Sequence, residues 1–96
     1  PDLILPVAQE LVKQLDEGQG VLVLTDMMGA TPSNIATRLY VPGKVEVLSG
    51  ASLPMLVRAL TYRHEGLSTV VAKAMSGGHD GIVHLVPSES NAATGS

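Results

Sequence analysis

The feature that most constrains this chain is a strand-like run that ends on a carboxylate and leads at once into a helix start. Residues 20–25 (GVLVLT) are apolar or β-branched, as in a strand covered on both faces. Asp26 follows, Gly29 allows the backbone to turn sharply, and Thr31-Pro32 suits the N-cap and first turn of a helix. The pattern predicts strand, loop and helix in direct succession.

The same layout recurs later in the chain. Residues 44–50 (KVEVLSG) predict a second strand, which runs into Gly50. Ser52 has the residue type of an N-cap, and Pro54 falls in the first turn of the helix expected over residues 52–63. Because the carboxyl ends of neighbouring parallel strands meet at one edge of a sheet, the two loops are expected to build one shared pocket.

Helical spacing and turn residues predict the remaining elements. The first helix is expected over residues 4–18, with an apolar stripe of Ile4, Ala8, Leu11 and Leu15. The stripe of the helix over 52–63 is expected to be Leu53, Leu56, Val57 and Leu60. We also expect a helix over 67–75 capped by Ser68, a turn over 77–81, a last strand over 81–86 at an edge or exchanged between subunits, and a disordered tail over 87–96.

Strands that alternate with helices predict one α/β domain over residues 1–86, a three-layer α/β/α arrangement with a mostly parallel sheet. Ligands of such sheets bind outside the carboxyl ends of the strands. Asp26 is expected there, beside a helix start whose free N–H groups and dipole attract anions. The loop contains neither GxxxxGK[ST] nor GxGxxG, so it is not a known nucleotide-binding fingerprint.

Composition excludes several classes of function. The chain has 96 residues, a formal charge of -3 and no cysteine, which argues against nucleic acid as a partner and rules out thiolate chemistry. No apolar run reaches the roughly 18 residues of a membrane span, so we expect no membrane insertion. We expect a cytoplasmic location and neither a metal nor a cofactor.

Two segments carry a resemblance to a known family. Residues 26–34 (DMMGATPSN) and 50–56 (GASLPML) resemble the signature loops of the mannose/fructose/sorbose-type IIA component (EIIA) of the bacterial phosphoenolpyruvate-dependent sugar phosphotransferase system (PTS). The GHDGI segment, residues 78–82, resembles the end of that family's pattern. The resemblance spans residues 4–86 and implies a phosphocarrier that accepts a phosphoryl group from HPr on a histidine and passes it to a IIB component.

The resemblance also implies roles for individual residues. Asp26 would orient the acceptor histidine, and a homodimer would be the typical assembly. The phosphoryl oxygens would be bound by the loop residues Gly29, Ala30, Thr31 and Ser33, and the second pocket loop would contribute Gly50 and Ser52.

The chain departs from the family at the acceptor. The family's histidine ends a first strand, and no matching stretch occurs in these 96 residues. His64, His79 and His84 are better explained by structural roles, so we expect a fragment or a divergent member that is inactive as this chain. The alternatives are a non-catalytic anion-binding or regulatory module and, more distantly, an aspartyl-phosphate receiver. A receiver would need an acidic pair after an earlier strand for Mg²⁺, and none is evident.

Overall fold

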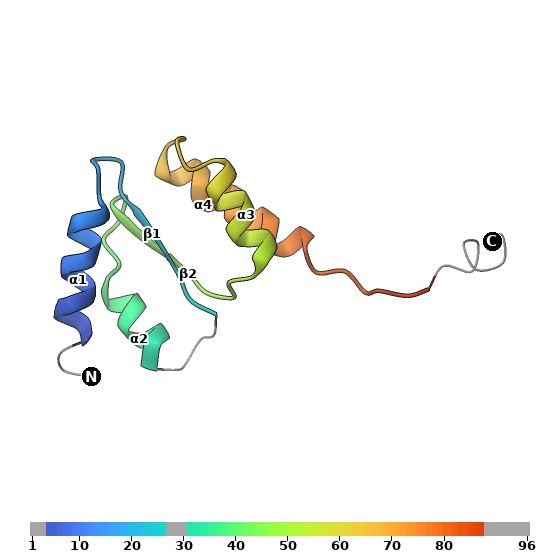
Figure 1. Ribbon diagram of the computed structural model, residues 1–96, viewed down its shortest axis with the longest axis horizontal. Coiled ribbons are helices and arrows are strands. Elements are labelled where there is room, and N and C mark those ends of the chain that lie inside the picture. The colour runs from blue at the N-terminus through green and yellow to red at the C-terminus, as the bar shows by residue number, and fades with distance from the viewer. Residues whose placement is uncertain (1–3, 27–30, 88–96) are drawn as a thin grey trace.

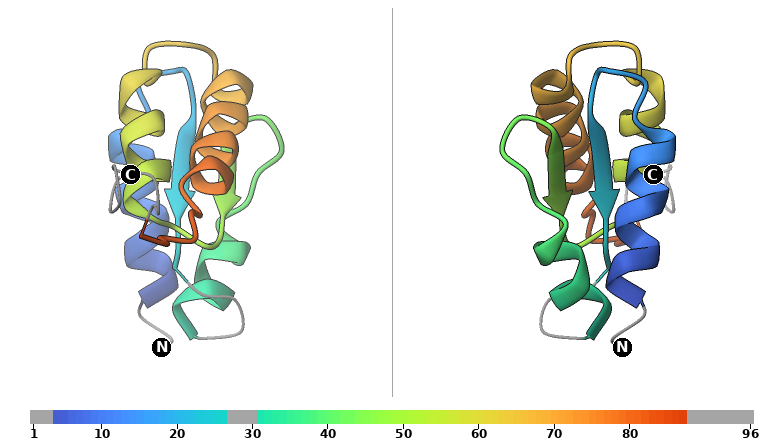
Figure 2. Two further views of the ribbon diagram at one scale, coloured as in Figure 1. Left: turned by 90° about the vertical axis from the view of Figure 1, so that its right-hand side faces the viewer. Right: turned by 90° about the vertical axis from the view of Figure 1, so that its left-hand side faces the viewer.

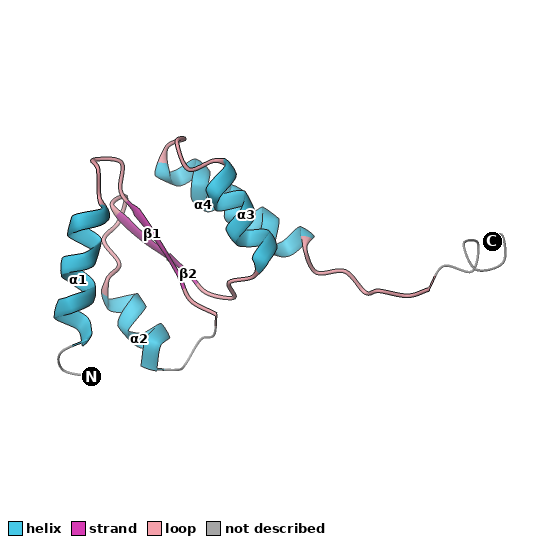
Figure 3. Ribbon diagram, in the orientation of Figure 1, coloured by secondary structure: helices cyan, strands magenta, loops and turns pink. Residues whose placement is uncertain are grey.

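Helices and strands alternate along the chain as expected (Figures 1 and 3). The computed structural model describes residues 4–26 and 31–87, and the side chains of residues 4–26 and 34–87. Its elements are α1 (Ile4–Leu15), β1 (Val21–Leu24), α2 (Thr31–Arg38), β2 (Val45–Leu48), α3 (Leu53–Thr61) and α4 (Leu67–Asp80). Two of the three predicted strands and all four predicted helices are therefore confirmed.

A small parallel sheet lies between two layers of helices. β1 and β2 pair in parallel, from Val21 opposite Val45 to Leu24 opposite Leu48. α1 and α2 lie on one side of the sheet, and α3 and α4 on the other (Figure 1). The α/β class is confirmed, and the sheet is open because the described residues contain only these two paired strands.

The main core lies between the sheet and the α3–α4 pair. Its buried members are Met55 and Ala59 from α3 and Val70 and Ala74 from α4; Ala74 is fully buried. Apolar residues at the carboxyl ends of the strands pack against this cluster. The core on the opposite face of the sheet, under α1 and α2, is smaller, since α1 contains no buried residue. The domain therefore depends mainly on α3 and α4 for its stability.

Replacing Met55 by alanine is expected to lower the free energy of unfolding by about 3 kcal/mol, because it leaves a cavity in a core that cannot collapse around it. Met55 is 5% exposed, whereas Met75 on α4 is 56% exposed. Met75→Ala is therefore the matched control, with an expected change below about 0.5 kcal/mol. Urea denaturation followed by circular dichroism would measure both, and equal losses would contradict this description of the core.

The expected turn at residues 77–81 is wrong, because α4 continues through both glycines to Asp80. A Cβ atom on Gly77 would lie 2.9 Å from the Pro54 carbonyl oxygen, and one on Gly78 would lie 3.0 Å from the Met55 side chain. The glycines thus allow α4 to approach α3 closely. The cap prediction for this helix is also wrong: Gly66 is the N-cap, and Ser68 lies inside the helix.

The predicted apolar stripes of α1 and α3 lie largely at the surface. Residues Leu53, Leu56, Val57 and Leu60 of α3 are exposed, as are Ile4, Leu11 and Leu15 of α1. Both helices are apolar over a wider arc than the sheet covers; α3 buries the neighbouring positions Met55 and Ala59 instead, whereas α1 buries none. Figure 2 shows α1 and α3 lying on the side of β1 away from β2, so the exposed apolar residues border the free edge of β1.

No strand forms over residues 81–86 in the structure. The segment follows Gly81, the C-cap of α4, and extends away from the domain (Figure 1). Ile82 is 82% exposed and Leu85 is 86% exposed, so this apolar segment has no apolar cover among the described residues. The predicted strand lacks a partner within the chain because the segment leaves the sheet.

Candidate functional site

Asp26 lies just beyond the carboxyl end of β1 and is exposed. The residue before it is fixed by both neighbouring segments: the Thr25 N–H donates to the Leu48 carbonyl at 2.9 Å, and the Thr25 carbonyl accepts from the Ala51 N–H at 3.0 Å. The second bond joins the end of β1 to the loop between β2 and α3. The sequence prediction that these two loops lie side by side is therefore supported at Thr25.

The loop between β2 and α3 is built by a glycine and a serine. Gly50 has a φ of 74°, a left-handed conformation that glycine adopts without strain. Ser52 is the N-cap of α3, since its Oγ accepts from the Met55 N–H at 3.3 Å. This confirms the predicted cap and gives the hydroxyl a structural role, while its own proton stays available to an acceptor.

The other loop of the predicted pocket is described only in part. Gly29 and Ala30 lie outside the described residues, whereas Thr31 and Ser33 belong to the first turn of α2. α2 starts at the same end of the sheet at which β1 finishes (Figure 1). Its first N–H groups have no partner within the helix and carry the positive end of the helix dipole. The fold thus brings a carboxylate and a helix start to one edge of the sheet.

None of the three histidines follows the end of a described strand. His64 follows the far end of α3 from Ser52, and His84 lies on the exposed segment that leaves the domain. His79 is exposed in the last turn of α4. Its neighbour Asp80 forms an ion pair with Arg58 Nη2 at 3.4 Å. Among the described residues, no three His, Asp or Glu side chains gather into a metal site.

Sequence reasoning missed an apolar groove at the free edge of β1. It has a volume of about 250 Å³ and is lined by residues of β1, α3 and α4, including Leu22, Leu24, Leu56 and Leu60. The signal was present in the sequence as the width of the apolar arcs on α1 and α3. A strand of only four residues between two such helices leaves part of both arcs uncovered.

The fold defines an open parallel α/β domain whose candidate binding groups lie at the carboxyl edge of its sheet. The chain belongs to the family described as PTS system fructose IIA component, which matches residues 5–75. No helix in the described ranges has the length and hydropathy of a membrane span.

Relatives of the chain carry the same description. It is 39% identical over 75 residues to the PTS system mannose-specific EIIAB component of Escherichia coli K12, and likewise to that of Shigella flexneri. The match covers 75% of this chain and 23% of each of those proteins, so the chain spans about a quarter of their length. A crystal structure of the phosphotransferase system component EIIA from Streptococcus agalactiae superposes with a TM-score of 0.70 at 35% identity, over 88% of this chain and 67% of that one.

Proposed function

We propose that this domain is a cytoplasmic phosphocarrier of a sugar phosphotransferase system, which takes a phosphoryl group from HPr on a histidine and delivers it to a IIB component. The observation that carries the proposal is the juxtaposition of Asp26, the Gly50–Ser52 loop and the start of α2 at one edge of the sheet. Family membership and the PTS names of the relatives support the same reading. Phosphoryl transfer depends mostly on positioning and electrostatic stabilisation, which such an edge can supply.

Each group has a distinct proposed task. The Asp26 carboxylate accepts a hydrogen bond from the histidine ring, orients it and stabilises its charged form. Backbone N–H groups and hydroxyls of Gly29, Ala30, Thr31 and Ser33 donate to the phosphoryl oxygens, aided by the dipole of α2. Gly50 and Ser52 form the second wall, where the Ser52 hydroxyl can donate while its oxygen caps α3.

The acceptor histidine is proposed to come from a strand that pairs in parallel with the free edge of β1. Such a strand would end beside Asp26, because parallel neighbours finish at the same edge of a sheet. The apolar groove at this edge and the exposed stripes of α1 and α3 suit a strand that is apolar on both faces. Leu56 and Leu60 would then be covered rather than exposed.

Intact mass tests the proposal directly. The full-length gene product and the 96-residue chain would each be incubated with phosphoenolpyruvate, enzyme I and HPr. We expect the full-length product to gain one acid-labile phosphoryl group and the 96-residue chain to gain none. If the full-length product stays unmodified, the proposal fails and the alternative, a non-catalytic anion-binding or regulatory module, is favoured. That alternative draws on the absence from these 96 residues of a histidine that ends a strand.

We also propose that the protein is a homodimer and that residues 82–86 pair with a second copy. The segment is apolar and exposed, and it projects away from its own domain. The apparent stability of such a dimer falls on dilution, because dissociation uncovers the segment. We expect a tenfold dilution to lower the unfolding temperature and Leu85→Lys to weaken dimerisation at least tenfold.

The matched control for the dimer is Ala72→Lys, an exposed site on α4 that leaves the segment intact. Sedimentation velocity across the dilution series would measure both variants. A wild-type chain that sediments as a monomer at every concentration would overturn this assembly, as would unfolding that is independent of concentration.

A further inference from the structure

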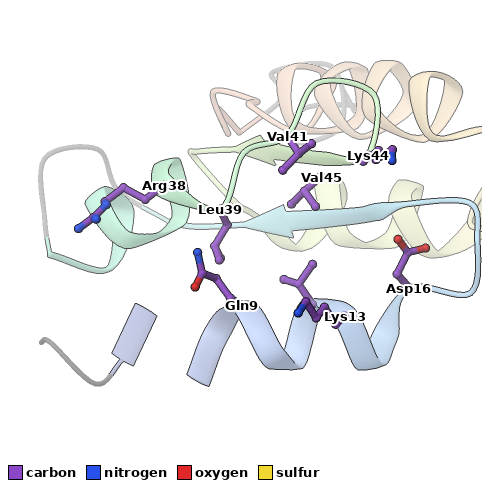
Figure 4. Close-up of a pocket in the computed structure, with 9 residues that line it drawn as sticks. Gln9, Lys13, Asp16, Arg38, Leu39, Val41, Lys44 and Val45 are labelled. Atoms are coloured by element: carbon purple, nitrogen blue, oxygen red, sulfur yellow. The ribbon is translucent and has the colours of Figure 1, made fainter. Parts of the chain in front are cut away.

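A second cavity lies between the sheet and the helices α1 and α2. It has a volume of about 430 Å³, within the size range of small-molecule sites. It lies between α1, the end of α2 and the start of β2 (Figure 4). Val45, the first residue of β2, pairs with Val21, the first residue of β1, so Lys44 and Val45 lie at the amino-terminal end of the sheet. Gln9 and Arg38 lie toward its carboxyl end (Figure 4). None of the described residues that line it belongs to the proposed phosphoryl site.

The cavity combines an apolar wall with a basic rim. Val12, Leu39, Val41 and Val45 supply the apolar surface, and Val45 is 6% exposed. The rim holds Lys13, Arg38 and Lys44, which are three of the six Lys and Arg residues in a chain with a net charge of -3. Figure 4 shows the Arg38 side chain directed away from Lys13 and Lys44, so these two lysines are the cations nearest the apolar wall, and they favour an anionic ligand.

The charges of this rim are not neutralised by the protein. Across residues 4–26 and 34–87, where side chains are described, Arg58 and Asp80 form the ion pair, and none joins Lys13, Arg38 or Lys44 to a carboxylate. Asp16 is the one acidic residue that lines the cavity. Its Oδ1 already accepts from the Gly18 and Gly20 N–H groups at 2.8 and 3.1 Å. The net charge of the lining is therefore positive.

Part of this lining is rigidly held. The Lys44 N–H donates to the Val41 carbonyl at 2.9 Å, and the Lys44 carbonyl accepts from the Val21 N–H at 2.9 Å. Val41 and Val45 exchange two further backbone bonds across the same turn, at 2.9 and 2.8 Å. The backbone of Lys44 is thus fixed to both strands before any ligand arrives, which lowers the entropic cost of binding.

We propose that this cavity binds a small organic anion, namely a carboxylate or phosphate ester attached to an apolar body. The apolar body would lie on Val12, Leu39 and Val45, and the anionic group would contact Lys13 and Lys44 on opposite walls. Because the ligand bridges α1 and β2, it would fix α1, which has no buried residue of its own, to the sheet. The inference does not depend on the proposed phosphocarrier function.

Amide chemical shifts of the ¹⁵N-labelled chain, titrated with phenyl phosphate, test the proposal. We expect saturable shifts centred on Lys13, Val41 and Lys44. Inorganic phosphate, which has only the anionic group, and phenol, which has only the apolar ring, should each bind at least tenfold more weakly than phenyl phosphate. Equal binding of inorganic phosphate, equal binding of phenol or the absence of saturation would overturn the proposal. Shifts centred instead on Thr25, Asp26 and Ala51 would also overturn it, because they would assign the anion to the phosphoryl site.

A pair of charge variants separates this cavity from general attraction of anions. Lys13→Gln combined with Lys44→Gln should weaken the binding of phenyl phosphate at least tenfold. Arg63→Gln combined with Lys73→Gln removes the same charge outside this cavity, where Arg63 donates to the Leu60 carbonyl and Lys73 lies over the Tyr62 ring. This control should change affinity less than twofold. Equal weakening by both pairs would overturn the proposal, and circular dichroism would verify that both pairs fold.

Discussion

Replacing Gly20 by alanine is expected to lower the free energy of unfolding by about 4 kcal/mol. Gly20 has a φ of 95°, which strains any residue with a Cβ atom. The added methyl would also lie 2.8 Å from the Lys44 carbonyl oxygen and 2.7 Å from Leu67 Cδ2. The leucine could turn aside, but the carbonyl could not.

The Lys44 carbonyl cannot move without cost because it forms the first hydrogen bond between the strands. It accepts from the Val21 N–H at 2.9 Å, next to the glycine itself. Displacing it would separate the amino ends of β1 and β2 and disturb the turn that holds Val41 and Lys44. The variant should therefore weaken the pairing of β1 with β2 and also strain the backbone at residue 20.

Gly18→Ala is the matched control. Gly18 has a φ of 100° and bonds to the same Asp16 carboxylate oxygen, but a Cβ atom there meets nothing within 4 Å. This variant should cost about 1 to 2 kcal/mol, the strain alone. Urea denaturation of both variants would measure the difference. Equal losses would show that the overlap with Lys44 contributes nothing.

The strands and their loops could be predicted because their signals are local. A run such as residues 20–25 is apolar on both faces only if helices cover both sides of the strand, and the structure confirms helices on both sides. The adjacency of the two loops followed from parallel pairing, and the bond between Thr25 and Ala51 supports it. In each case the residue type and its immediate neighbours contained the information.

The errors share a different cause. The sequence around Gly77 and Gly78 is typical of a turn, but both glycines lie within α4. Their lack of a Cβ atom allows α3 to approach closely, as the contact of Gly77 with Pro54 shows. Helical spacing likewise cannot tell which part of a wide apolar arc faces the core. In α3 the buried positions are Met55 and Ala59, one step around the helix from the predicted stripe.

The position of the proposed acceptor histidine could not be predicted from the sequence, because the partner of a strand edge is set by tertiary contacts and not by local residue patterns. Asp26 is exposed in the structure, although a carboxylate that orients a ring needs a partner beside it. The open edge of β1 and the groove against Leu56 supply the physical reason to look for that partner on an adjacent strand. The exposed apolar surface and the exposed carboxylate thus both support the proposal of a further strand beside β1.

Replacing Asp26 by asparagine in the full-length gene product is expected to slow phosphoryl transfer from HPr by about 100-fold, the loss typical when one electrostatic contact to a developing charge is removed. Asparagine keeps the size and one acceptor oxygen, so the ring can still be positioned, but the negative charge that stabilises the phosphorylated cationic histidine is gone. Asp26 is exposed, so the fold should be unaffected.

Glu10→Gln is the matched control, since it removes one negative charge from an exposed position on α1, away from the carboxyl edge of the sheet. Transfer rates from phosphorylated HPr, followed by quenched-flow mass analysis, should be unchanged by this variant. If Glu10→Gln slows phosphoryl transfer as much as Asp26→Asn does, the effect would be assigned to net charge and to the encounter with HPr. A fall confined to Asp26, together with unchanged unfolding midpoints, would locate the effect at the carboxyl end of β1, where the histidine, the carboxylate and the start of α2 are proposed to meet.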